Sequence, residues 1–154
     1  MKELIDTFYT AFAKGDWQTM AGCYHDEVEF NDPVFKGLKG KEAGAMWRML
    51  IERSKGNINI TYTNVVADEK NGRAEWVARY LFSATGRNVI NRIHAEFEFR
   101  DGKIIKHTDQ FDLHKWAGQA MGLKGKLFGG LPFFRKKVQK TAREGLNRFL
   151  SKNI

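Results

Sequence analysis

The sequence predicts an α+β domain in which three helices are followed by an antiparallel sheet. Apolar residues recur at helical spacing in three stretches within residues 2–53. From Asn57 onward the spacing changes to a period of two, and turn sequences separate the alternating stretches. Because the helices precede the strands along the chain, we expect them to pack together on one face of the sheet.

The first two predicted helices meet at Gly15 and Asp16. The first covers residues 2–14, and glycine commonly ends a helix. Aspartate is a favoured N-cap, so we expect Asp16 to start the second helix. The apolar positions are Leu4, Ile5, Phe8, Tyr9 and Phe12 in the first helix and Trp17, Met20, Ala21 and Tyr24 in the second.

A short extended segment separates the second helix from the third. Residues 28–30 alternate briefly, and the Asp32-Pro33 pair breaks the segment because proline disfavours helix in the residue before it. Residues 37–40 contain two glycines and predict a loop. Residues 41–53 predict the third helix, with Ala45, Met46, Met49 and Leu50 on one face and Trp47 nearby.

Four strands are predicted after the third helix. The first contains Ile58, Ile60 and Tyr62 in alternation with polar residues. The others are expected at residues 73–83, 88–100 and 103–113, with turns at Lys70-Asn71-Gly72, Thr85-Gly86 and Asp101-Gly102.

The C-terminal segment carries the net charge of the chain. The formal net charge is +8, and residues 124–154 contain nine basic side chains against the single acid Glu144. Overall charge therefore does not indicate a nucleic-acid partner. Residues 118–132 contain five glycines and predict a hinge, and Pro132 can start a helix. One apolar stripe on that helix comprises Phe134, Val138, Ala142, Leu146 and Phe149.

The composition fits one folded domain of 154 residues, 42% of them hydrophobic. Cys23 is the single cysteine, so no intrachain disulfide is possible, and we expect it to be a packed small side chain. Four scattered histidines predict no metal site. The apolar runs are too short for a membrane span, and the N-terminal stretch is amphipathic and carries acids, so we expect a cytoplasmic protein.

Several segments together resemble the SnoaL-like branch of the nuclear transport factor 2-like superfamily. They are the first helix, GDWQTMAGCYHDEVEFNDP at residues 15–33, the third helix, and a strand meander that ends in GKIIKHTDQFDL. The resemblance covers about residues 1–116, and we expect residues 117–154 to add a hinge and a helix to the same domain. It implies a cone with three helices on the concave face of a curved sheet, an apolar small-molecule ligand, and a homodimer.

Members of this superfamily include ketosteroid isomerases, limonene-epoxide hydrolases, polyketide cyclases and non-catalytic binding proteins. The isomerase base is the aspartate of an Asp-Pro pair, and the resemblance places this role at Asp32. The isomerases also use two oxyanion donors, whose positions are occupied here by Phe8 and Ala95. Neither side chain can donate a hydrogen bond, which argues against steroid isomerisation by that mechanism.

The resemblance to the epoxide hydrolases and cyclases points to the last strand. In the hydrolases an aspartate there activates water, and its matching residue is Asp109. An arginine that assists it matches Arg79, but the position of the second assisting aspartate is Leu81, so the triad is incomplete. The cyclases use a single last-strand aspartate as base, and Asp109 can fill that role.

Strand alternation supports an inner position for Asp109 independently of the resemblance to the family. Ile105, His107, Asp109 and Phe111 share one face of the last strand, and two of these four are apolar. Burial in an apolar cone raises the pKa of a carboxyl group toward the range of a general base, and we expect Arg79 or His107 as its charge partner. The predicted ligand-binding residues are Phe8, Phe30, Trp47, Ile93, Ala95, Phe97 and Phe111.

Each candidate also has a structural interpretation. Asp109 can be a structural acid paired with Arg79 or His107, and Asp32 can cap a turn. The leading hypothesis is a cofactor-independent isomerase, cyclase or hydrolase that acts on an apolar substrate with a carbonyl group or a ring. Its catalytic residues would be Asp109, Asp32, His107 and Arg79. The alternative is a non-catalytic binding or carrier protein for an apolar ligand.

The basic C-terminal helix has three interpretations. It can fold back over the mouth of the cone or over the sheet, it can form dimer contacts, or it can lie on an anionic membrane surface. We favour the first of these from the sequence.

Overall fold

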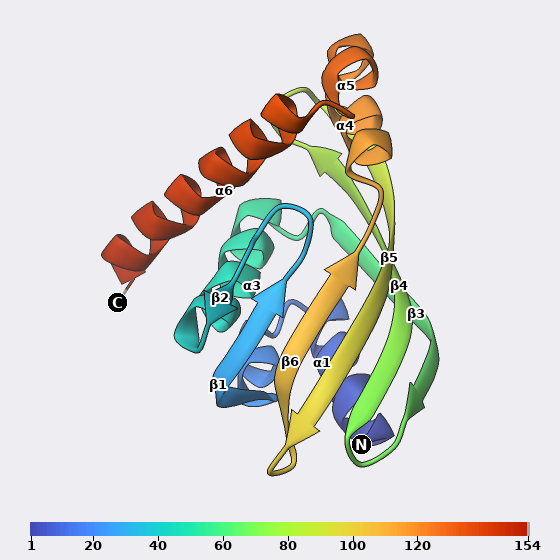
Figure 1. Ribbon diagram of the computed structural model, residues 1–154, viewed down its shortest axis with the longest axis vertical. Coiled ribbons are helices and arrows are strands. Elements are labelled where there is room, and N and C mark those ends of the chain that lie inside the picture. The colour runs from blue at the N-terminus through green and yellow to red at the C-terminus, as the bar shows by residue number, and fades with distance from the viewer. Residues whose placement is uncertain (154) are drawn as a thin grey trace.

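One curved sheet of six strands forms the frame of the molecule (Figure 1). The computed structural model describes residues 1–153. The spatial order of the strands is β2-β1-β6-β5-β4-β3. Their bounds are β1 Tyr24–Asn31, β2 Leu38–Lys39, β3 Ile58–Ala67, β4 Asn71–Phe82, β5 Arg87–Arg100 and β6 Lys103–Gln110. The predicted four-strand meander is confirmed as β3 to β6, and β1 and β2 extend it at one edge.

Strand β1 lies parallel to β6, whereas every other neighbouring pair in the sheet is antiparallel. The sheet differs from the prediction at this pair. A parallel pair needs a long crossover, and the chain between β1 and β6 supplies one with helix α3 (Lys41–Ser54) and four strands. The register pairs Phe30 with His107 and Asn31 with Thr108, so Asp32 follows beside Asp109.

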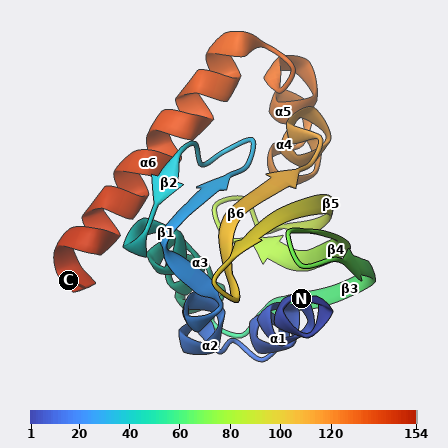
Figure 2. The same ribbon diagram turned by 60° about the horizontal axis from the view of Figure 1, so that its bottom comes forward.

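Three N-terminal helices cover the concave face of the sheet, as predicted (Figures 1 and 2). They are α1 (Lys2–Ala13), α2 (Trp17–Gly22) and α3. Asp16 caps α2, since its carboxylate accepts a hydrogen bond from the Thr19 N–H at 3.1 Å. Helix α2 ends at Gly22, so Tyr24 begins β1 instead of continuing the helix, and its side chain is buried in the core.

A β-bulge changes which residues of β6 face inward. Glu98 pairs with Lys106 and Phe99 pairs with Ile104, which leaves Ile105 as an extra residue on β6. Ile104 is therefore the buried residue, and Ile105, which strict alternation placed inside, is only half-buried. After the bulge the alternation resumes, so His107 and Asp109 point inward as predicted.

The segment predicted as a glycine-rich hinge contains two helices, α4 (Leu113–Met121) and α5 (Leu123–Phe128). Asp112 caps α4 by accepting a hydrogen bond from the Lys115 N–H at 3.0 Å. Gly122 ends α4 with a φ of +67°, and Gly125 lies directly against the Ala117 carbonyl. The glycines thus permit a tight helical corner rather than a flexible hinge.

Helix α6 (Pro132–Asn153) starts at the predicted proline and folds back on the domain. It packs on α3 and on the turn after β1, not across the sheet (Figure 2). Its predicted apolar stripe faces inward, with Leu146 fully buried. Arg143 forms a salt bridge of 2.6 Å with Glu42, and the Gln139 side-chain amide donates to the Pro33 carbonyl at 3.0 Å.

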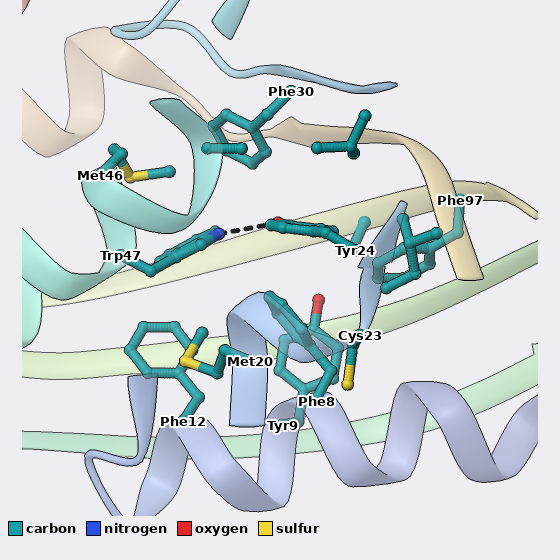
Figure 3. Packing of buried hydrophobic residues seen from close by; sticks show 14 of the residues in the cluster. Phe8, Tyr9, Phe12, Met20, Cys23, Tyr24, Phe30, Met46, Trp47 and Phe97 are labelled. Atoms are coloured by element: carbon teal, nitrogen blue, oxygen red, sulfur yellow. Dashed lines mark hydrogen bonds between the residues drawn. The ribbon is translucent and has the colours of Figure 1, made fainter. Parts of the chain in front are cut away.

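Aromatic side chains fill the space between the helices and the sheet (Figure 3). The ring centroids of Phe97 and His107 are 4.4 Å apart, and those of Phe12 and Trp47 are 5.0 Å apart. Edge-to-face and offset contacts of this kind add to the free energy gained by burying apolar area. This part of the interior is therefore closely packed core.

The α4–α5 corner provides a test of the fold. Gly125→Ala is expected to lower the free energy of unfolding by about 1–3 kcal/mol, because the added methyl group would overlap the Ala117 backbone carbonyl. Denaturant unfolding followed by circular dichroism measures this. Gly22→Ala is the matched control, since a methyl group there meets nothing within 4 Å. Equal stability of the two variants would contradict the observed contact between α4 and α5.

Candidate functional site

A chain of side-chain hydrogen bonds runs through the aromatic core. The Trp47 indole N–H donates to the Tyr24 hydroxyl at 2.7 Å, as Figure 3 shows. The Tyr24 hydroxyl is 2.8 Å from His107 Nδ1, and His107 Nε2 is 2.9 Å from Asp109 Oδ1. All four side chains are buried, and the exposed fraction is 0% for His107 and 3% for Asp109.

The Trp47 indole sets the direction of this chain because it can only donate. Since the Tyr24 oxygen accepts from Trp47, the hydroxyl proton is available for His107 Nδ1. Neutral His107 then carries its proton on Nε2 and donates to Asp109. The hydrogen bonds thus orient the imidazole and deliver a donor to the carboxylate.

The two oxygens of Asp109 have different surroundings. Oδ1 accepts from His107 and also from the Trp76 indole N–H at 3.3 Å. Within residues 1–153, Oδ2 is a buried oxygen without a hydrogen-bond partner, and the Tyr9 hydroxyl is the other buried side-chain polar atom of this kind. Oδ1 therefore holds the carboxylate in place, and Oδ2 is the oxygen that can take up a proton.

Tyr9 lies near Asp109 in this core. Burial raises the pKa of the Tyr9 hydroxyl well above its ordinary value, and the negative charge of Asp109 raises it further. Tyr9 is therefore neutral at physiological pH and keeps a proton to donate.

Asp32 lies beside Asp109 at the end of the parallel β1–β6 pair. Its Oδ1 accepts hydrogen bonds from the Val34 N–H at 2.7 Å and the Phe35 N–H at 2.6 Å. These bonds form a side-chain-capped turn, as the structural interpretation of Asp32 predicts. Asp32 is half-buried and is the more exposed of the two carboxyl groups.

The pKa of Asp32 is raised to about 7. Burial is the main cause, and the nearby Asp109 charge adds to it, while the two backbone N–H groups act in the opposite direction. Below about pH 7 Asp32 therefore holds a proton, next to Asp109, whose Oδ1 accepts two hydrogen bonds. Two neighbouring carboxyl groups in different environments are typical of acid–base chemistry.

The structure brings Asp32, His107 and Asp109 together, but it does not bring Arg79 to them. Along β4 the residues Ala74, Trp76 and Ala78 are buried on the inner face, so Arg79 points outward. Arg79 is exposed and donates to the Thr61 hydroxyl at 3.3 Å. His107, the other expected partner, occupies the position beside Asp109.

The predicted ligand-binding residues lie in two environments. Phe111 is half-buried just after β6. Buried and packed in the core are Phe8, Phe30, Trp47, Ile93, Ala95 and Phe97. Most of the residues predicted to line a ligand pocket are therefore core residues that pack around the hydrogen-bond chain.

Two polar side chains of the site, Tyr9 and Tyr24, were not predicted from the sequence. Tyr24 was assigned to a helix, and its inward direction depends on the helix ending two residues earlier. Tyr9 was noted only as an apolar helix position. Trp76, which the sequence predicts as a core or pocket-lining residue, is buried on the inner face of β4.

Two hollows on the described surface lie away from Asp32 and Asp109. One of about 460 Å³ is on the outer face of the sheet, and one of about 550 Å³ lies between α2, α3 and α6. Within residues 1–153, no group of three or more His, Cys, Asp or Glu residues could hold a metal ion. No described helix is both long and apolar enough to cross a bilayer. The homodimer and the cytoplasmic location stay predictions.

A family model described as a SnoaL-like domain matches residues 5–107, which is more than half of the chain. The match includes Asp32 and His107 and ends two residues before Asp109. Helices α4 to α6 also lie beyond it. No curated protein sequence gives a significant match.

Solved structures share the fold at low sequence identity. A candidate polyketide cyclase from Xanthomonas campestris pv. campestris is 23% identical, with a TM-score of 0.62, and the match covers 77% of this chain and 94% of that one. TerC co-crystallised with polyporic acid is 18% identical, with a TM-score of 0.63 and coverage of 77% and 96%. An epoxide hydrolase of M. tuberculosis that resembles limonene-epoxide hydrolase is 20% identical, with a TM-score of 0.59 and coverage of 81% and 92%. These neighbours are covered almost completely, whereas about a fifth of this chain lies outside each match.

The buried hydrogen-bond chain predicts a specific loss of stability. Tyr24→Phe leaves Trp47 Nε1 and His107 Nδ1 without their shared partner, so we expect the free energy of unfolding to fall by about 2–4 kcal/mol. Denaturant unfolding measures the loss. Tyr80→Phe is the matched control because the half-buried Tyr80 hydroxyl serves one donor, Trp116 Nε1 at 2.7 Å. A larger loss in the control would contradict the central role of Tyr24.

The raised pKa of Asp32 predicts a pH-dependent stability. Because the folded-state pKa of about 7 exceeds the ordinary value of 3.8, the stability from this group is complete below about pH 4 and is lost as pH rises through 7. Asp32→Asn removes this loss and keeps an oxygen that can accept from the turn. The variant is therefore expected to gain stability relative to wild type, on the order of 3 kcal/mol, between about pH 4 and pH 8. Urea unfolding across this range measures the difference.

Asp68 provides a control because its pKa is shifted in the opposite direction to that of Asp32. It caps a similar turn by accepting hydrogen bonds from Lys70 and Asn71, each at 2.8 Å, but it is exposed and these bonds lower its pKa. The contribution of Asp68 to the free energy of unfolding is present above the ordinary carboxyl pKa and is lost as pH falls through the folded-state pKa. Asp68→Asn should therefore lose stability relative to wild type at neutral pH and approach it on acidification. The same pH trend in both variants would contradict the burial effect at Asp32.

Proposed function

Because the chain belongs to the SnoaL-like domain family, we propose that it is a cofactor-independent enzyme whose paired carboxyl groups perform general acid–base chemistry. The substrate class is an apolar small molecule with a carbonyl group or a ring, and the reaction is an isomerisation, a cyclisation or a hydrolysis. One observation carries the proposal. Asp32 directly follows β1 next to Asp109 on the paired strand β6, with the pKa of Asp32 raised to about 7 and Asp109 held by two donors.

Asp109 is the general base in this proposal. His107 and Trp76 fix Oδ1, which leaves Oδ2 to remove a proton from the carbon beside a carbonyl group or from a water molecule. The Trp47 and Tyr24 hydrogen bonds hold His107 in the tautomer that donates to Asp109. Asp109 therefore needs no reorientation when it accepts the proton.

Asp32 and Tyr9 complete the proposed chemistry. When the C–H bond breaks, its electron pair moves onto the carbonyl oxygen, and the neutral Tyr9 hydroxyl can donate a hydrogen bond to that oxygen. Asp32 donates its own proton to the substrate, and transfer of the proton from Asp109 to Asp32 then restores the starting state. In a hydrolysis, Asp109 activates water and Asp32 protonates the leaving oxygen. No cofactor is needed in either route.

Substrate access in this proposal depends on the turn that follows Asp32. Asp109 is 3% exposed, so a substrate must reach it from the side of the more exposed Asp32. The turn is held to α6 by the hydrogen bond from Gln139 to the Pro33 carbonyl. Displacement of this turn would open the path to Oδ2, and the half-buried Phe111 and Val34 would supply apolar contacts.

A non-catalytic binding protein is the second candidate function. It is favoured by the close packing of most predicted lining residues and by the two backbone hydrogen bonds that make Asp32 a turn cap. In that case Asp109 and His107 would serve to satisfy buried polar groups in the core.

Substrate turnover and NMR titration separate the two candidates. We would screen cyclic ketones and epoxides and titrate the carboxyl carbons, with Asp32→Asn and Asp109→Asn used for assignment. An enzyme predicts an Asp32 pKa near 7 and at least a roughly 100-fold loss of kcat/KM in Asp109→Asn. Tyr9→Phe should lower kcat without loss of stability, since it removes a hydroxyl that has no partner among the described residues.

The matched control is Asp101→Asn. Asp101 is an exposed turn residue with a φ of +54°, a conformation that asparagine accepts readily. It should leave turnover unchanged. If ligands bind without turnover, and Asp109→Asn binds them as tightly as wild type, the non-catalytic candidate stands and the enzyme proposal fails.

A further inference from the structure

The corner formed by α4, α5 and the start of α6 exposes large apolar side chains. We name residues 123–133 the apolar tip. Its exposed apolar residues are Leu123, Leu127, Phe128, Leu131 and Phe133. Leu127 and Phe133 are 63% and 61% exposed, which is unusual for side chains of this size. Five such side chains within eleven residues form a patch rather than scattered exposure.

Exposed basic residues lie within the apolar tip and flank it along the chain. The chain has no acidic residue between Asp112 and Glu144. The same interval contains Lys115, Lys124, Lys126, Arg135, Lys136, Lys137, Lys140 and Arg143. All of these except Arg143 are exposed, and Arg143 is the one that forms a salt bridge with a described residue, Glu42. Seven exposed cations therefore have no acidic partner within residues 1–153.

The tip lies at one end of the molecule. The corner of α4, α5 and α6 projects beyond the sheet, and the N-terminus lies at the opposite end (Figure 1). The C-terminal half of α6 is anchored on α3 through the buried Leu146, whereas its first turn is largely exposed. A flat surface could thus contact the tip without meeting the rest of the domain.

We propose that the apolar tip and the lysines around it dock on an anionic phospholipid membrane. Leucine and phenylalanine side chains can enter the boundary between headgroups and acyl chains, while lysines remain at the level of the phosphates. No described helix is long and apolar enough to cross a bilayer, so the contact is interfacial. This inference does not depend on the enzymatic proposal.

Charge and apolar exposure together favour a lipid surface over other occupants. A second copy of the chain would bring two like-charged tips together, at a cost in Coulomb energy. A nucleic acid would satisfy the lysines but would leave the leucines and the exposed Phe133 without an apolar partner. An anionic bilayer satisfies both features, because it offers negative headgroups above an apolar interior.

Vesicle sedimentation of the full chain tests the proposal. The probes are vesicles of phosphatidylcholine alone and vesicles that also contain phosphatidylserine. We expect binding to the phosphatidylserine vesicles, with binding that weakens as salt rises. Lys136→Glu with Lys137→Glu should weaken this binding about tenfold or more, since each basic residue near an anionic surface contributes on the order of a fivefold effect. Leu127→Ser with Phe133→Ser should weaken it comparably.

Two double variants serve as matched controls. Lys2→Glu with Lys70→Glu reverses two exposed lysines outside the tip, and Val66→Ser with Leu81→Ser replaces two exposed apolar residues of the sheet. Both should bind vesicles like wild type. Circular dichroism and thermal unfolding confirm that every variant is folded.

Several outcomes would overturn the proposal. Absence of vesicle binding, or equal binding to phosphatidylcholine alone, excludes an anionic membrane as the partner. Binding to DNA that is as tight as binding to vesicles and insensitive to the Leu127 and Phe133 replacements indicates a nucleic-acid surface. Self-association in sedimentation velocity that these two replacements abolish indicates that the tip pairs with a second copy.

Discussion

The hydrogen bond from the Trp47 indole to the Tyr24 hydroxyl is the constraint on which the interior depends. An indole nitrogen can only donate, so this contact fixes where each following proton lies. Tyr24 then donates to His107, and His107 donates to Asp109. Four polar side chains are thereby accommodated in an aromatic core, where an unpaired polar group would be costly. Loss of any member leaves at least one buried partner unsatisfied.

The parallel contact between β1 and β6 adds the second carboxyl group to this arrangement. It places Asp32 beside Asp109 with the two side chains in unequal surroundings. Asp109 accepts from two fixed donors, whereas burial raises the pKa of Asp32. Two neighbouring carboxyl groups in unequal surroundings are suited to acid–base chemistry. The raised pKa of Asp32 also makes the free energy of unfolding depend on pH. Structural and catalytic interpretations of Asp32 are thus compatible, because the same turn that it caps also keeps it half-buried.

The C-terminal helices α4 to α6 lie beyond the segment that the family model matches. The family match ends at residue 107, and the solved neighbours are covered almost fully by only about four fifths of this chain. The extension carries the net charge and the exposed apolar tip. It also contacts the turn after Asp32 through Gln139. A helix beyond the family match therefore lies next to the candidate site.

The sequence by itself determined the three N-terminal helices, the meander of β3 to β6, the Asp16 cap, the start of α6 and the inward direction of His107 and Asp109, because these follow from local periodicity and from residues that start or end a helix. Tertiary structure decided the parallel β1–β6 register and the bulge at Ile105. The segment predicted as a hinge also forms helix, as α5 and the end of α4. Such features depend on which segments meet across the fold and on how one extra residue shifts a strand, and no local pattern encodes those contacts.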